Sequence, residues 1–124
     1  ISPLKLVQLH AALANGGFEV TPHVTSTFKE RFNKNPKKQL FSYEVSKTVL
    51  EWMESVVDKG SGSGAKIEGY RIAGKTGTSQ KAINGSYTSK KVCSFVATFP
   101  VNDPKFAADL ISDSVVREIS PIID

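Results

Sequence analysis

Apolar residues recur with helical spacing near the start of the chain. Ser2 is a favourable cap for free helix amides, and Pro3 suits the first helical position. The predicted helix runs through residues 4–14, "LKLVQLHAALA", and stops at Asn15-Gly16-Gly17. Apolar positions surround most of its circumference, so we expect it to be mostly buried between two layers. The remaining polar strip consists of Lys5, Gln8 and Asn15.

A second helix is predicted over residues 43–59, because apolar positions recur there along one continuous stripe. Ser42 is a suitable cap, and Gly60 ends the helix. The stripe is formed by Val45, Val49, Trp52, Met53, Val56 and Val57. We therefore expect Trp52 and Met53 to be core residues, and we interpret the "GSGSG" segment that follows as a flexible loop.

The second half of the chain contains apolar and β-branched runs separated by turn signals, which indicate strands. We expect strands at residues 70–78, 92–99 and 105–111, followed by a short terminal helix over residues 114–123. Residues 18–28 also have extended character. Consecutive strands with short connections predict an antiparallel sheet, flanked by the two longer helices. The predicted fold class is therefore α+β, with a mainly antiparallel sheet.

The composition is that of an ordinary globular chain. Its 124 residues are 40% hydrophobic and 23% charged, which corresponds to one domain or a piece of one. The formal net charge of +4 owes much to a basic run at residues 29–38. This run has no helical spacing, so we interpret it as a solvated loop or hairpin tip and expect no nucleic-acid partner. Cys93 is the only cysteine, which excludes an internal disulfide and predicts a small core residue.

Residues 69–76 fit the pattern G-x-x-x-x-G-K-[ST] of a phosphate-binding loop. Such a loop needs a buried strand before its first glycine and a helix that starts at the Lys-Thr pair. Here Gly69 follows the polar segment "SGSGAKIE", and the residues after Thr76, "GTSQKAINGSYTS", are poor helix formers. The context therefore disfavours a nucleotide-binding domain, which is the least favoured of the functions considered.

A strand that carries Lys75 to Thr78 fits this sequence better than a phosphate-binding loop does. Side chains alternate along a strand, so Thr76 and Thr78 point to one side, where two hydroxyls can hydrogen-bond a carboxylate. Gly77 lacks a side chain, so another backbone can lie close by, and Lys75 adds a positive charge. At a sheet edge, such a strand can pair with an extended peptide. The alternative is an ordinary edge strand that carries a lysine and two threonines.

The stretch "GYRIAGKTGTSQ" at residues 69–80 resembles the third motif region of penicillin-binding protein transpeptidase domains, where an apolar strand enters Gly-Lys-Thr-Gly-Thr. The resemblance is strongest to the class that cross-links cell-wall peptides during growth and division (class B), and it covers most of the chain. Similar segments are "ISPLKLVQLHAALANGGFEVTPHV", "VLEWMESVVDKGSGSGA", "CSFVATFPVNDPKF" and "VVREISPIID". It implies that residues 1–124 are the C-terminal part of a transpeptidase domain with a serine β-lactamase-like fold.

The resemblance also implies roles for individual residues. Lys75 would support the hydrogen-bond network around a serine nucleophile, and Thr76, Gly77 and Thr78 would bind the substrate. The ligand would be a D-Ala-D-Ala stem peptide or a β-lactam, with the backbone N–H of Thr78 in the oxyanion hole. The resemblance implies no metal or organic cofactor. It also implies a parent protein anchored at the outer face of the cytoplasmic membrane, with cell-wall synthesis or division partners.

The other motifs of this family are S-x-x-K, which carries the acylated serine, and S-D-N or S-x-N. The chain contains no S-x-N, and its S-x-x-K matches at Ser2, Ser26 and Ser63 lack the expected context. We interpret Ser2 as a helix cap and expect the nucleophile to lie outside this chain. After Phe106 the chain is shorter and more polar than the family pattern, so the last strand is less well defined. The alternative to an enzyme is a non-catalytic, peptide- or partner-binding remnant of the domain.

Overall fold

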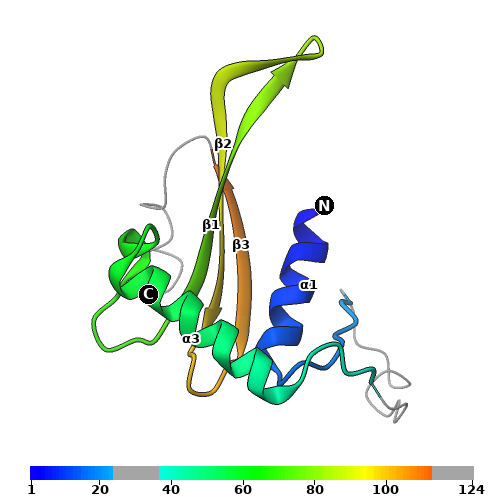
Figure 1. Ribbon diagram of the computed structural model, residues 1–124, viewed down its shortest axis with the longest axis vertical. Coiled ribbons are helices and arrows are strands. Elements are labelled where there is room, and N and C mark those ends of the chain that lie inside the picture. The colour runs from blue at the N-terminus through cyan, green and yellow to red at the C-terminus, as the bar shows by residue number, and fades with distance from the viewer. Residues whose placement is uncertain (24–36, 113–124) are drawn as a thin grey trace.

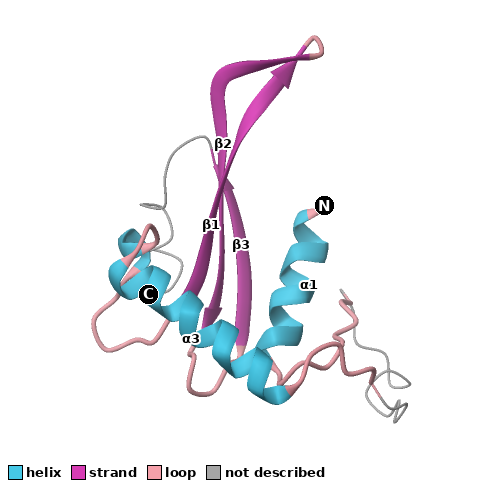
Figure 2. Ribbon diagram, in the orientation of Figure 1, coloured by secondary structure: helices cyan, strands magenta, loops and turns pink. Residues whose placement is uncertain are grey.

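The computed structural model describes residues 1–23 and 37–112 as an α+β unit. Its elements are α1 (Pro3–Ala14), α3 (Tyr43–Lys59), the short 3₁₀ helix η1 (Ser63–Ala65), β1 (Ala73–Ile83), β2 (Ser86–Phe99) and β3 (Phe106–Ser112). The three strands form an antiparallel sheet in the order β1-β2-β3, and α1 and α3 lie beside its lower half (Figures 1 and 2). The predicted fold class is confirmed.

The two long helices begin and end close to the predicted residues, because their caps are formed as the sequence suggests. The Ser2 hydroxyl accepts a hydrogen bond from the N–H of Lys5 at 3.3 Å. The Ser42 hydroxyl accepts one from the N–H of Val45 at 3.2 Å. Each cap satisfies an amide that the first helical turn leaves without a partner.

The buried face of α3 differs from the predicted stripe. Met53 is buried as expected, but Trp52 is 68% exposed, so its assignment to the core is wrong. The buried residues of this helix are Ser46, Leu50, Met53 and Val57. This row lies next to the predicted stripe on the helix surface, and the position of β1 decides which of the two rows is covered.

The first helix is also less buried than predicted. Within the described part of the chain it packs against β3, β2 and α3, and only Ala12 is fully buried. Leu4 is 61% exposed. The prediction of a mostly buried helix between two layers is therefore wrong for the described residues, because the packing partners that they supply cover only part of the helix surface.

One of the two hydrophobic clusters among the described residues contains the ring of Phe95 in β2. This ring packs with Val57 of α3, Ala65 of η1 and Ile72, which precedes β1. Two glycines make the close packing possible: a Cβ at Gly74 would collide with the ring, and one at Gly62 would lie 3.1 Å from it. Gly62 belongs to the segment predicted as a flexible loop, and that prediction is wrong. The segment instead forms a turn and the start of η1 against the core.

The strands have partly different limits from those predicted. Strand β1 begins at Ala73 rather than residue 70, and it continues to Ile83. It then turns through Asn84 and Gly85, which both have positive φ angles of 50° and 78°, as two-residue hairpin turns require. Strand β3 confirms the third predicted strand, although Asp109 lies within it. The predicted terminal helix and most of the basic run lie outside the described residues.

We predict that Gly74→Ala destabilises the protein by about 1–3 kcal/mol, because the added methyl group would collide with the Phe95 ring. Thermal or denaturant unfolding would measure the loss. Phe95→Leu in the same chain should recover part of it, because the smaller side chain vacates the space that the methyl group needs. Fully additive effects of the two substitutions would contradict this account of the packing.

Candidate substrate-binding edge

The four residues Lys75 to Thr78 lie on the outer strand of the described sheet. Strand β1 pairs with β2 along one edge, and no described strand pairs with its other edge. Thr76 and Thr78 lie opposite Phe95 and Cys93, whereas Lys75 and Gly77 face the opposite side. Among the described strands, β1 therefore lies at the edge of the sheet, as binding of an extended peptide requires. The structure also places the tetrapeptide in a strand, and not at the start of a helix as a phosphate loop would require.

The hydroxyl group of Thr76 has a neighbour that the sequence did not reveal. The Ser61 hydroxyl lies 2.9 Å from Thr76 Oγ1, within hydrogen-bond distance. Ser61 belongs to the turn between α3 and η1, which is held against the sheet beside Phe95. This contact restricts the orientation of the Thr76 hydroxyl. Thr78 is exposed, and its neighbour Cys93 is half-buried rather than a core residue.

The positive charge of Lys75 lies close to the same strand. Its side chain is exposed, and its ammonium group donates a hydrogen bond to the backbone carbonyl of Thr76 at 2.5 Å. The lysine starts on the opposite face from the threonine side chains, but its flexible stem brings the charge back to the backbone. A cation and two hydroxyls are thus available along one stretch of β1.

Gly77 is tightly placed, but not in the way predicted. A Cβ at this position would lie 2.6 Å from the Ser94 hydroxyl oxygen on β2. The nearest obstacle is therefore the end of a short side chain within the sheet. A larger residue here would require the Ser94 side chain to move, and this movement would change the packing of β1 between Lys75 and Thr78.

The face that carries Lys75 also holds a buried acid. Lys75 lies opposite Val96, and Val96 lies opposite Asp109 on β3, so the three residues form one row across the sheet. Both carboxylate oxygens of Asp109 are buried, and no described side chain donates a hydrogen bond to them. Burial raises the pKa of the Asp109 carboxyl, and the nearby His10 on α1 and the backbone N–H of Leu110 partly oppose the shift. Ionised Asp109 is therefore costly in the folded protein.

The serines of the S-x-x-K matches do not form a nucleophilic site in the described residues. Ser2 caps α1, as expected. Ser63 begins the short helix η1, and Lys66 forms an ion pair with Asp58 at 3.5 Å. Ser26 lies outside the described residues. No group of three His, Cys, Asp or Glu side chains in the described ranges could hold a metal ion.

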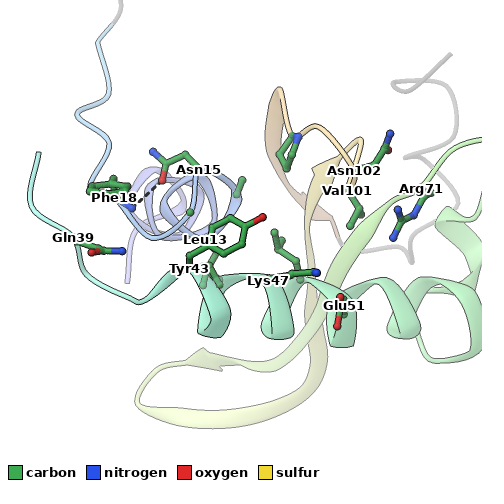
Figure 3. Close-up of a pocket in the computed structure, with 15 residues that line it drawn as sticks. Leu13, Asn15, Phe18, Gln39, Tyr43, Lys47, Glu51, Arg71, Val101 and Asn102 are labelled. Carbon is green, nitrogen blue, oxygen red and sulfur yellow. Dashed lines mark hydrogen bonds between the residues drawn. The ribbon is translucent and has the colours of Figure 1, made fainter.

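A pocket of about 370 Å³ lies away from the motif, where α1 ends beside α3 and the turn after β2 (Figure 3). Leu13, Leu50 and Val101 supply apolar walls, and Lys47 and Glu51 come from α3. Arg71 also lines it, but two hydrogen bonds of 2.7 and 2.8 Å bind its guanidinium group to Glu54. None of the residues Lys75 to Thr78 lines this pocket. The predicted site therefore lies outside the pocket, on the edge of β1 that pairs with no described strand.

Comparison with known proteins decides the family of this chain. Residues 1–115 match the penicillin binding protein transpeptidase domain. The chain belongs to this family. The matched residues include α1, α3, the three strands and the tripeptide Lys75-Thr76-Gly77.

Named relatives agree with this assignment. The chain is 36% identical over 127 aligned residues to the peptidoglycan D,D-transpeptidase FtsI homolog of Mesostigma viride, covering 86% of this chain and 21% of the relative. It is 34% identical over 123 residues to stage V sporulation protein D of Bacillus subtilis, covering 92% and 19%. The chain thus spans about a fifth of the length of these relatives.

A solved structure agrees with the fold. The transpeptidase domain of Burkholderia pseudomallei penicillin-binding protein 3 matches with a TM-score of 0.79 and 25% identity, covering 97% of this chain and 38% of that one. The α+β arrangement of this chain is therefore that of a transpeptidase-domain portion. In the described part of the chain, no helix is both long and apolar enough to cross a membrane.

We predict that Asp109→Asn stabilises the protein near pH 7, by about 1 kcal/mol, because it removes a buried charge to which no described side chain donates a hydrogen bond. Since the folded-state pKa of Asp109 is raised, the wild type is most stable below the unfolded-state pKa and loses stability as pH rises through the folded-state pKa. The advantage of the variant should therefore shrink on acidification. Unfolding midpoints between pH 4 and pH 8 would measure this.

The matched control is Asp103→Asn, because Asp103 is exposed and pairs with Lys105 at 3.2 Å. This variant should show no gain at neutral pH. An Asp109→Asn advantage that is the same at every pH, or absent at pH 7, would contradict the assignment of a raised pKa.

Proposed function

We propose that this chain is the Lys-Thr-Gly portion of a serine D,D-transpeptidase that cross-links peptidoglycan. The observation that carries the proposal is the position of Lys75 to Thr78 on an open edge strand, in a chain of the transpeptidase-domain family. The FtsI homolog among its relatives is named for this activity. A free strand edge suits an extended peptide, which can add to the sheet by backbone hydrogen bonds.

In the proposed site, the hydroxyls of Thr76 and Thr78 bind the terminal carboxylate of a D-Ala-D-Ala stem peptide, or the carboxylate of a β-lactam. Lys75 supports the hydrogen-bond network around the nucleophile, and Gly77 leaves room along the strand. The backbone N–H of Thr78 donates to the oxyanion that develops during acyl transfer. A donor of this kind contributes roughly 2.7–4 kcal/mol to transition-state stabilisation.

The proposed reaction has two acyl-transfer steps. A serine hydroxyl attacks the carbonyl between the two D-alanines, loses its proton to a base and forms an ester, while the terminal D-alanine leaves with a proton as the free amino acid. An amine of a neighbouring stem peptide then attacks the ester, which forms the cross-link and regenerates the serine. We place the serine and its base outside residues 1–124, on the domain portion that carries the S-x-x-K motif.

The proposal includes a location and partners. The substrate is the peptide of the cell wall, so the domain would act at the outer face of the cytoplasmic membrane. An anchor outside residues 1–124 would hold it there, together with proteins of wall synthesis or division. The chain itself requires no cofactor for this role, because the acyl transfer uses only a serine, a base and hydrogen-bond donors.

The first experiment concerns the isolated chain of residues 1–124. It should form no covalent adduct with a fluorescent penicillin, because the proposed nucleophile lies elsewhere. Incubation followed by denaturing electrophoresis would measure this. A labelled band that disappears in Ser26→Ala or Ser2→Ala would overturn the placement of the nucleophile.

The decisive experiment uses the protein as the cell makes it. Thr76→Val and Thr78→Val each keep the side-chain shape but remove a hydroxyl from the proposed carboxylate site. Each should slow penicillin acylation roughly 10- to 100-fold, the range expected when one hydrogen bond to a charged group is lost. Stopped-flow or gel-based acylation kinetics would measure the rates.

Thr48→Val is the matched control, because Thr48 lies exposed on α3 and away from the motif. It should acylate like the wild type. Unchanged rates in both motif variants would refute the proposed substrate contacts. A wild-type protein that binds wall peptides but is never acylated would instead favour the non-catalytic remnant.

A further inference from the structure

Beyond the motif, β1 and β2 continue as a two-stranded hairpin that projects from the body of the molecule (Figure 1). The last pair between β2 and β3 joins Cys93 to Ser112, so the hairpin beyond it has no third described strand. We call residues 79–92 the basic arm. An isolated two-stranded hairpin is only marginally stable in water, and such an element gains most from a partner.

The basic arm carries charge of one sign. Lys81, Lys90 and Lys91 lie in it, and Lys75 precedes it on β1. No Asp or Glu occurs anywhere in residues 69–102, although the whole chain contains 12 acidic residues. An array of cations without interspersed carboxylates attracts anions more strongly than a mixed surface does. The charge pattern therefore favours an anionic partner.

The tip of the basic arm adds apolar contact area. Tyr87 is 79% exposed and Ile83 is 46% exposed, on either side of the turn at Asn84 and Gly85. These side chains cover little of the described core. A molecule that lies along the arm can therefore combine ionic contacts with lysines and apolar contacts with the tip.

The basic arm is continuous with the proposed substrate-binding edge. Gln80 lies two residues beyond Thr78, about 7 Å along the strand, and it pairs with the exposed Lys91 on β2. An extended polymer held at Lys75 to Thr78 would therefore pass the lysines if it continued along β1. The polymer proposed for that edge bears carboxylates on its stem peptides, which complement the charge of the arm.

We propose that the basic arm binds carboxylates of the peptidoglycan polymer beyond the stem peptide held at the Lys-Thr-Gly motif. This inference rests on the proposed function, because the identity of the polymer comes from it. The arm would act as a second contact, which raises the residence time of the polymer beside the site. Its lysines bind by charge and not by shape, so the contact should weaken as salt screens it.

The test measures binding of the protein, as the cell makes it, to purified cell-wall sacculi by co-sedimentation. Replacement of Lys90 and Lys91 together by Gln should weaken binding about fivefold, if each exposed pair contributes the usual fraction of a kcal/mol. The matched control replaces Lys38 and Lys47 by Gln, which removes the same charge from exposed positions outside the arm. The control should retain wild-type affinity. Equal weakening in both double variants would overturn the proposal.

Salt provides an independent measurement that needs no variant. Binding of the wild type should fall steeply between 50 and 500 mM salt, as expected for exposed charges that added salt screens. The arm variant should show a shallower dependence. Wild-type binding that does not respond to salt would overturn the proposal even if the variant failed to fold.

Two treatments of the sacculi identify the source of the anion. Chemical amidation of the peptide carboxylates should abolish the difference between wild type and arm variant, whereas removal of phosphodiester polymers should leave it unchanged. The reverse result would overturn the assignment to carboxylates. Penicillin acylation separates the two proposals. If the protein is acylated but binds sacculi equally well without the arm lysines, only the proposed binding by the basic arm is refuted. If the protein is never acylated, the proposed transpeptidase function is refuted.

Discussion

The packing of the Phe95 ring against two glycines is the constraint on which the candidate site depends. Gly74 leaves room for the ring at the start of β1, and Gly62 lets the turn after α3 approach the ring closely. The turn that contains Gly62 also contains Ser61, which reaches the Thr76 hydroxyl. One aromatic contact therefore holds together the helix, the turn and the strand that carries the motif. A substitution that alters this packing would therefore change the position of the Thr76 hydroxyl, although the motif residues themselves stay the same.

The sheet presents two chemically different faces at the same strand. Thr76 and Thr78 share a face with Phe95 and Cys93, whereas Lys75 shares the other face with Val96 and Asp109. These groups become available to one ligand only because β1 is an edge strand and the Lys75 stem is flexible. In the middle of a sheet the same residues would be separated by a layer of backbone. The edge position thus converts an alternating strand into a single surface that can meet a carboxylate.

The same edge connects the motif to the basic arm. Strand β1 extends well past Thr78, and the third strand ends before the hairpin does. By the described residues the extension is less covered than the body of the sheet, and Lys90, Lys91 and the tip side chains are exposed. Packing decreases and solvent exposure increases along β1. Its start is packed against Phe95, its middle carries the motif, and its end projects from the body of the sheet. This gradient follows from the end of β3 at Ser112, and it suits a strand that binds one end of a long molecule.

Local chemistry in the sequence determined much of this protein. Serine caps and glycine stops predicted both long helices, and apolar and β-branched runs between turn signals predicted the three strands, because these signals act within a few residues. The resemblance around Lys75 to Thr78 identified the family and the edge strand. The Asn84-Gly85 hairpin turn was missed, although Asn-Gly is a strong local signal for such a turn.

Only the tertiary structure decided which residues meet across the fold. It selected Leu50 rather than Trp52 for the core, because the position of β1 covers one of two adjacent helix rows. It also brought Ser61 to Thr76 and left the Asp109 carboxylate without a hydrogen bond from any described side chain. These outcomes depend on the distance between segments far apart in the chain, and the order of residues within one segment carries no record of that distance.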